Sequence, residues 1–269
     1  MRAVRPAAVA GTFYPGRRKD LVSTLDALLA PARATVDPTV AGAKAYVLPH
    51  AGYVYSGSTA ALGYAELERR RDTITRVVLL GPTHRVPVDG LALPGVDGLE
   101  TPLGIVRVEP VDPAVRAELP QLVDAPEVHA QEHSLEVHLP FLQTVLGDVA
   151  VVPLAVGRAQ PGQVAAVLDA LWGGAETVVV VSSDLSHYLR QDEARAVDEL
   201  TVAEVLRLEG PLHHSQACGA TPVNGLLLSA RRRGMTTRLL GMCTSGDVTG
   251  DRRRVVGYAA IAFTEPAAG

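Results

Sequence analysis

His50, His84 and His187 each follow, within a few residues, an apolar run of four residues. Such runs are typical of strands that are buried on both faces of a sheet. Because ligands of open α/β sheets bind at the carboxyl ends of the strands, we expect the three imidazoles to lie at the same edge. Imidazole pairs bind iron, copper, zinc or nickel, so the pattern predicts a metal site at His50 and His84 without identifying the metal.

Cys218 is the candidate third ligand. It precedes an apolar-periodic segment in which Thr221 suits the N-cap and Pro222 the first turn of a helix. Since the positive end of a helix dipole lowers the pKa of a nearby thiol, we expect Cys218 to be a thiolate ligand or a nucleophile. The alternative is a small buried apolar residue, which is our interpretation of Cys243 at the end of a predicted strand.

Asp184 and His187 lie three residues apart after the all-valine run. His187 suits acid/base catalysis because its unperturbed pKa is close to neutral pH. Asp184 has three roles open to it: it could orient a ring nitrogen, bind the metal or cap the turn. His213 and His214 are interpreted as ordinary hydrogen-bonded residues without a role in the site.

A rival pattern lies between residues 129 and 133. His129, Glu132 and His133 match H-x-x-E-H, in which two histidines one helical turn apart bind zinc and the glutamate is the base. Nearby prolines leave little room for a rigid helix centred on this segment. We therefore favour the interpretation that Glu132, His133 and Glu136 line or support a cleft, and we keep zinc hydrolysis as the alternative.

The order of apolar patterns predicts an α/β fold. Helices are expected at 20–29, 56–69, 135–146, 163–171 and 193–208, strands at 149–154, 237–242 and 254–261, short antiparallel strands within 88–108, and a loop at 32–43. Strands that alternate with helices imply a three-layer α/β/α sandwich with a mixed, mostly parallel central sheet. We expect one domain spanning residues 1–269.

The composition limits the classes of partner that we expect. The formal net charge is -4 and the arginine triplets are short and scattered, so we expect no nucleic-acid ligand. No apolar run approaches the roughly 20 residues that a bilayer requires, and we expect no membrane association. Two cysteines form no disulfide framework and the chain shows no secretory signal, which favours the cytoplasm. Phe13, Tyr53 and Tyr55 are candidate cleft walls for a planar ligand, with ordinary packing as the alternative.

Several motifs, taken in order along the chain, resemble the Memo protein family. They are Gly11-Thr12-Phe13-Tyr14-Pro15, Pro49-His50-Ala51-Gly52-Tyr53, Gly81-Pro82-Thr83-His84, Thr101-Pro102-Leu103-Gly104, Glu132-His133-Ser134-Leu135-Glu136-Val137-His138-Leu139-Pro140, Ser182-Ser183-Asp184-Leu185-Ser186-His187 and Cys218-Gly219. The set extends from about Pro6 to Tyr258 and is highly specific. The family is similar in fold to class III extradiol dioxygenases, which hold non-haem Fe2+ with two histidines and a glutamate.

The resemblance implies roles for particular residues. His50 and His84 would be the imidazole ligands, Cys218 would replace the dioxygenase glutamate, and His187 would be the acid/base with Asp184 beside it. It implies Fe2+ most strongly, with Cu or Zn as alternatives, and a redox or dioxygenase-like activity. Bacterial and archaeal relatives are associated with a radical-SAM protein and an AMMECR-like protein, so a non-catalytic module that binds a small molecule, a peptide or these partners is the alternative function.

Overall fold

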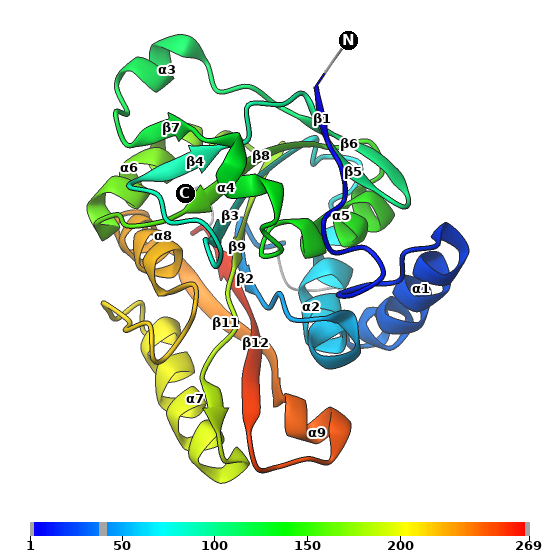
Figure 1. The fold of residues 1–269 in the computed structure, drawn as a ribbon. Coiled ribbons are helices and arrows are strands. Elements are labelled where there is room, and N and C mark those ends of the chain that lie inside the picture. The colour runs from blue at the N-terminus through cyan, green and yellow to red at the C-terminus, as the bar shows by residue number, and fades with distance from the viewer. Residues whose placement is uncertain (1–2, 38–41, 267–269) are drawn as a thin grey trace.

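The computed structural model describes residues 3–37 and 42–266 (Figure 1). The strands are β1 (Val4–Arg5), β2 (Ala45–Leu48), β3 (Arg76–Pro82), β4 (Leu91–Leu93), β5 (Gly98–Thr101), β6 (Gly104–Val108), β7 (Leu122–Asp124), β8 (Ala150–Val156), β9 (Thr177–Ser182), β10 (His187–Leu189), β11 (Thr236–Thr244) and β12 (Val255–Thr264). The helices are α1 (Arg18–Thr35), α2 (Tyr53–Glu68), α3 (Pro113–Ala117), α4 (Pro126–Ala130), the 3-10 turn η1 (Glu136–His138), α5 (Leu139–Leu146), α6 (Pro161–Leu171), α7 (Gln191–Leu206), α8 (Ala220–Arg232) and α9 (Ser245–Thr249).

The centre of the sheet is parallel, in the order β6-β8-β3-β9-β2. Antiparallel strands extend it at both ends. At one end β12 pairs with β2 and carries β10 and β11, and at the other β5 pairs with β6. The important consequence is that β9 lies between β2 and β3, so the segments that follow these three strands leave the sheet side by side.

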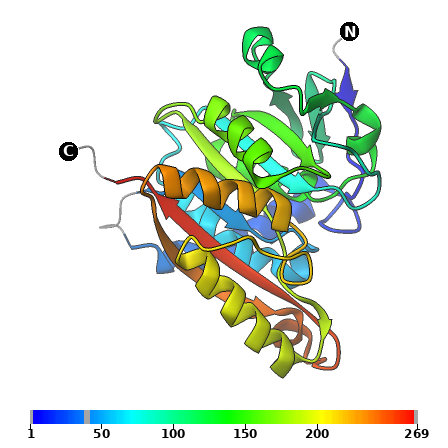
Figure 2. The same cartoon turned by 90° about the vertical axis from the view of Figure 1, so that its left-hand side faces the viewer.

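Alternating side chains of β3 face two separate cores. Val77 and Leu79 belong to the core beneath α1, α2 and α5, whereas Val78 and Leu80 belong to the core beneath α6, α7 and α8. Each fully buried side chain of this size contributes roughly 1.5–3 kcal/mol of burial free energy, which favours covering both faces with helices. Figures 1 and 2 show these two helical layers on opposite sides of the sheet. The predicted three-layer sandwich is confirmed.

Several element boundaries differ from the predictions. Helix α1 continues through Pro31 to Thr35, so the N-terminal part of the expected loop at 32–43 is helical, and residues 38–41 lie outside the described part of the chain. Within 88–108, β5 and β6 are antiparallel, but β4 pairs in parallel with β7. The expected helix at 135–146 begins as a 3-10 turn, and Pro140 then occupies the first turn of α5, where its missing N–H costs nothing.

Two helix starts also differ. Helix α2 begins at Tyr53, three residues before the predicted start. Helix α8 is capped by Gly219 rather than by Thr221, and Pro222 lies in its first turn as expected. Among the described residues no helix has both the length and the apolar character that crossing a bilayer would require.

Candidate metal centre

His50 and His84 converge because their strands flank β9. His50 follows β2 and His84 follows β3, and their ring centroids are 5.1 Å apart in an edge-to-face arrangement. His50 is almost completely buried, while His84 retains partial exposure. Burial, reinforced by the neighbouring imidazoles, lowers the pKa of His50 well below its ordinary value. A neutral imidazole is the form that binds metal.

His133 completes a three-histidine cluster. Ligand atoms of His50, His84 and His133 all lie within 4.8 Å of one another, and no other such group of metal-binding side chains is found in the described ranges. The His133 ring stacks on His84 with centroids 4.5 Å apart and meets the Phe13 ring in a tilted arrangement at the same distance. Burial lowers the pKa of His133 to about 4, so this imidazole is also neutral near pH 7. The three histidines could hold one metal ion.

Glu132 fixes the orientation of His84. Its Oε1 accepts from His84 Nδ1 at 2.9 Å and from the backbone N–H groups of His133 and Ser134, and its Oε2 accepts from the His84 N–H at 2.6 Å. Burial would raise the pKa of Glu132, but these hydrogen bonds lower it to about 2, which keeps the carboxylate charged. The proton of His84 is therefore held on Nδ1, and Nε2 is the atom that could bind a metal.

The Ser182 hydroxyl at the end of β9 fixes the tautomer of His50. Ser182 Oγ donates its one proton to the Ser134 carbonyl at 2.7 Å. It lies 2.6 Å from His50 Nδ1 and 2.9 Å from His138 Nε2. Because a hydroxyl has one proton and two lone pairs, both imidazoles must donate to it. His138 Nδ1 then accepts from the Tyr64 hydroxyl at 2.7 Å. This series of hydrogen bonds leaves His50 Nε2 unprotonated, which is the state in which it can bind a metal.

Cys218 lies beside His50 because α8 approaches the end of β9 closely. The Cys218 Sγ is 3.3 Å from His50 Nε2. The next residue must be glycine, since a Cβ at Gly219 would lie 2.6 Å from the Ser182 carbonyl oxygen. The expectation of a lowered thiol pKa is wrong: burial, followed by the charge of Asp184, raises the pKa of Cys218 to about 12. Desolvation therefore outweighs the helix dipole at this position.

The overall sequence matches one family along nearly its full length. The family model described as Memo-like protein matches residues 5–262. This chain belongs to the Memo family. It is 36% identical over 283 residues to a MEMO1 family protein of Aeropyrum pernix, covering 96% of this chain and 99% of the relative.

Two further MEMO1 family relatives match to a similar extent. The protein of Archaeoglobus fulgidus is 34% identical over 277 residues and that of Aquifex aeolicus is 33% identical over 274 residues. Each alignment covers 97% of this chain and 99% of the relative. The resemblance to the Memo family drawn from the motifs is confirmed.

In this Memo-family chain, Asp184 and His187 have separate partners. Asp184 Oδ1 accepts from the His50 N–H at 2.8 Å, and its Oδ2 is 4.0 Å from His50 Nε2. Burial raises the pKa of Asp184 to about 7 against the hydrogen bond from His50. His187 Nδ1 instead donates to the Leu185 carbonyl at 2.8 Å. The orienting partner of His187 is thus the Leu185 backbone, and Asp184 supports His50.

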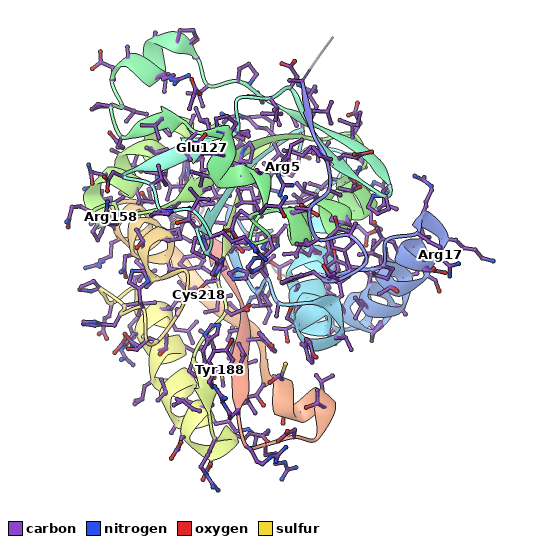
Figure 3. All side chains as sticks on the ribbon, viewed as in Figure 1. Arg5, Arg17, Glu127, Arg158, Tyr188 and Cys218 are labelled. Atoms are coloured by element: carbon purple, nitrogen blue, oxygen red, sulfur yellow. The ribbon has the colours of Figure 1, made fainter. Side chains whose placement is uncertain are left out.

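Two cavities flank the cluster. The first, of about 510 Å³, is lined by His84 and Cys218 and extends to Arg158, and Figure 3 labels Cys218 near the middle of the view and Arg158 at its left edge. The second, of about 630 Å³, is lined by residues that include His133, Asp184 and His187. The cluster is therefore reached from two sides.

The candidate aromatic walls divide into two groups. Phe13 and Tyr55 line the second cavity, whereas Tyr53 does not. Tyr53 is buried, packs on Tyr14 and Phe141, and donates its hydroxyl proton to the Val137 carbonyl at 2.7 Å. Because α2 begins at Tyr53, the side chains of Tyr53 and Tyr55 leave opposite sides of the first helical turn. Ordinary packing is the role that the structure gives Tyr53.

The H-x-x-E-H segment does not form a helical zinc motif. Helix α4 ends at Ala130, so His129 and His133 are not on one helix. His129 is buried and its Nε2 donates to the Ala92 carbonyl at 2.8 Å, away from the cluster. The favoured sequence interpretation placed His133 in the cleft, and only the zinc alternative made it a ligand, together with His129 rather than with His50 and His84. Its position next to Glu132, whose carboxylate anchors His84, is the signal that could have done so.

Glu136 supports the cleft indirectly, as expected. The buried carboxylate pairs with Arg5 at 2.6 Å and accepts from the Ala8 and Val9 N–H groups and the Tyr14 hydroxyl. These contacts hold the N-terminal segment against η1. Since Phe13 lies within that segment, the anchor places one wall of the second cavity.

Proposed function

We propose that this Memo-family protein is a non-haem metal-dependent oxidoreductase of dioxygenase type that acts on a planar hydroxylated substrate in the second cavity. The observation that carries the proposal is the three-histidine cluster, in which hydrogen bonds fix the tautomers of His50 and His84, with the acid/base candidate His187 nearby. Fe2+ is the metal proposed first because the family resemblance implies it most strongly. Cu and Zn are alternatives because a set of imidazoles with a neighbouring thiol can bind all three metals. When bound, Fe2+ would supply Lewis acidity and redox chemistry toward oxygen.

The donor set fits such an ion. His50 and His84 each engage Nδ1 in a hydrogen bond, which leaves Nε2 unprotonated; His50 Nε2 lies 3.3 Å from Cys218 Sγ. The third ligand is proposed to be Cys218 or His133. Cys218 is the choice that the family resemblance implies, and a coordinating cation deprotonates a thiol despite a raised pKa. His133 is the choice that the cluster geometry favours: its buried Nδ1 has no hydrogen-bond partner in the described structure, although Glu132 Oε1 is 3.3 Å away.

His187 is proposed as the acid/base. Burial lowers the pKa of His187, and its Nδ1 proton is engaged with Leu185, so the neutral ring presents an unprotonated Nε2. A substrate hydroxyl in the second cavity would transfer its proton to this nitrogen. Asp184 is proposed to hold His50 in place by accepting a hydrogen bond from the His50 backbone N–H, rather than to relay the substrate proton.

Metal analysis of four variants tests the proposal. The protein is purified anaerobically and its metal content is measured for the wild type, His50→Ala, Cys218→Ala, His133→Ala and the control His129→Gln. We expect near-stoichiometric metal in the wild type and control, loss in His50→Ala, and loss in whichever of the other two removes the third ligand. A wild type that fails to retain or take up Fe2+, Cu or Zn would refute the proposal. Oxygen consumption with catechols then compares the wild type with His187→Ala, which should keep metal and lose turnover.

A binding module is the second candidate, favoured by the cavity on the far side of the cluster. The first cavity extends from His84 and Cys218 to the polar side chains of Arg158, Gln160 and Gln163, so a ligand can contact the cluster without entering the second cavity. A radical-SAM or AMMECR-like protein is the proposed partner. Partner affinity that survives loss of metal in His50→Ala would support this candidate, and affinity that depends on metal would oppose it.

A further inference from the structure

The second cavity contains an aromatic platform held in an unusual backbone conformation. Tyr188 follows the acid/base candidate His187 directly and has a φ of +61°, in the left-handed region that bulky residues rarely adopt. The register of β10 against β12 is interrupted at this residue. Strain of this kind persists where the surroundings impose it, and it is common at ligand sites. Its effect here is to direct the Tyr188 side chain outward from the sheet.

Burial does not explain the position of this tyrosine. The Tyr188 residue is 64% exposed, yet it lines the second cavity and its ring contacts the His187 ring with centroids 5.7 Å apart. Figure 3 shows Tyr188 below Cys218, on the side of α7 and β12. An exposed aromatic ring next to a catalytic base is a surface on which a planar ligand can stack.

Arg254 covers the Tyr188 ring. Its guanidinium carbon lies 5.0 Å from the ring centroid, and Arg254 also lines the second cavity. No ion-pair partner of Arg254 is found among the described residues. The acidic residue of the same wall, Asp251, is already neutralised, because both of its carboxylate oxygens accept from the Arg253 side chain at 3.0 and 2.8 Å.

The charges along the cavity are therefore unequal. Asp184 lies at the end near the cluster, where its carboxyl faces His50. At the outer end, the positive charge of Arg254 has no counterion. A guanidinium presents a planar set of donors that matches a carboxylate in a bidentate geometry. The residues that line the cavity thus combine aromatic rings, the candidate base His187 and a guanidinium that can bind an anion.

We infer that Tyr188 and Arg254 form a subsite for a carboxylate carried by an aromatic substrate. This inference deepens the proposed function and rests on it: the substrate class is a catechol with an acidic substituent, whose ring stacks in the cavity while its carboxylate pairs with Arg254. Neutral catechols would bind more weakly because they leave the guanidinium without a partner.

Binding of three small probes tests the subsite. Catechol, 3,4-dihydroxybenzoate and its neutral analogue 3,4-dihydroxybenzamide are titrated calorimetrically into protein loaded with redox-inert Zn2+, and into metal-free protein. We expect the wild type to bind the benzoate about tenfold more tightly than the benzamide. This factor is at the lower end of what a hydrogen bond to a charged group contributes to affinity, because the site is partly exposed. Arg254→Gln should reduce this preference to less than twofold. Arg252→Gln is the matched control and should retain it, because Arg252 neither lines the cavity nor pairs with Asp251.

The outcomes separate the subsite from the metal proposal. Equal affinity for benzoate and benzamide in the wild type, an unchanged preference in Arg254→Gln, or no binding of either probe up to millimolar concentration would each overturn the subsite. Catechol affinity that is the same with and without metal would instead count against the proposed function. In that case a benzoate preference that still depends on Arg254 would leave the subsite standing as a feature of the cavity alone.

Discussion

Replacing Glu132 by glutamine should weaken metal binding without unfolding the protein. The carboxylate accepts four hydrogen bonds, one from His84 Nδ1 and three from backbone N–H groups. An amide has one oxygen and one NH2 group, so it cannot accept at both positions. With the amide oxygen at the Oε1 position, the NH2 group faces the His84 backbone N–H and repels it, which displaces His84. In the opposite orientation, Nδ1 must become an acceptor and the ring proton moves to Nε2, where it blocks coordination.

The size of the effect follows from the loss of the carboxylate that orients His84. Loss of a carboxylate that orients a metal-binding histidine typically costs 10–100-fold in metal affinity, which corresponds to about 1.4–2.7 kcal/mol. Competition with a chromophoric chelator measures this affinity for Zn2+ or Fe2+. Glu127→Gln is the matched control, since Glu127 is exposed in α4 and has no contact with the cluster. An affinity of Glu132→Gln within threefold of the wild type would refute the reasoning about His84.

Two further predictions concern stability. Glu136→Gln removes the charge that pairs with buried Arg5, and breaking such a pair costs roughly 3–5 kcal/mol of unfolding free energy. Urea unfolding measures this free energy, and a loss below about 1 kcal/mol would contradict the role of Glu136 as an anchor. The metal-free protein should also lose stability as pH falls from about 6.5 to 4, because burial lowers the pKa of folded His129 to about 4 while the unfolded chain takes up a proton near pH 6.5. The unfolded state binds the extra proton in this window, so the expected contribution is about 1.4 kcal/mol per pH unit. Urea midpoints of His129→Gln should depend less steeply on pH than those of the wild type, and parallel curves would exclude His129 as the cause.

The sheet and the first two candidate ligands could be predicted because their signals are local. Apolar runs identify the strands, and the side chains that follow parallel strands meet at one edge, which is how His50 and His84 were found. Helix boundaries were less predictable. Pro31 is accommodated within α1, and Tyr53 begins α2 without a side-chain cap, so neither leaves a clear mark in the sequence.

The remaining parts of the site depend on packing between distant segments. His133 reaches the cluster because Glu132 binds the loop after β3, a contact between residues 48 positions apart. The raised pKa of Cys218 results from burial, which position near a helix start cannot reveal. Likewise, no local pattern distinguishes Arg254 from the neighbouring arginines, because Arg254 reaches the second cavity only through the folded hairpin of β11 and β12.

The anchor on Glu136 has a consequence for synthesis of the chain. Its contacts with Arg5, Ala8, Val9 and Tyr14 join residues 122 to 131 positions apart. At roughly 5–20 residues per second, translation takes on the order of 6 to 25 seconds to cover that interval. The first residues made are thus not secured until about half of the chain has been synthesised. A nascent chain stalled before Glu136 would leave Phe13 unanchored, and the cavity wall that it provides would be missing from every shorter translation product.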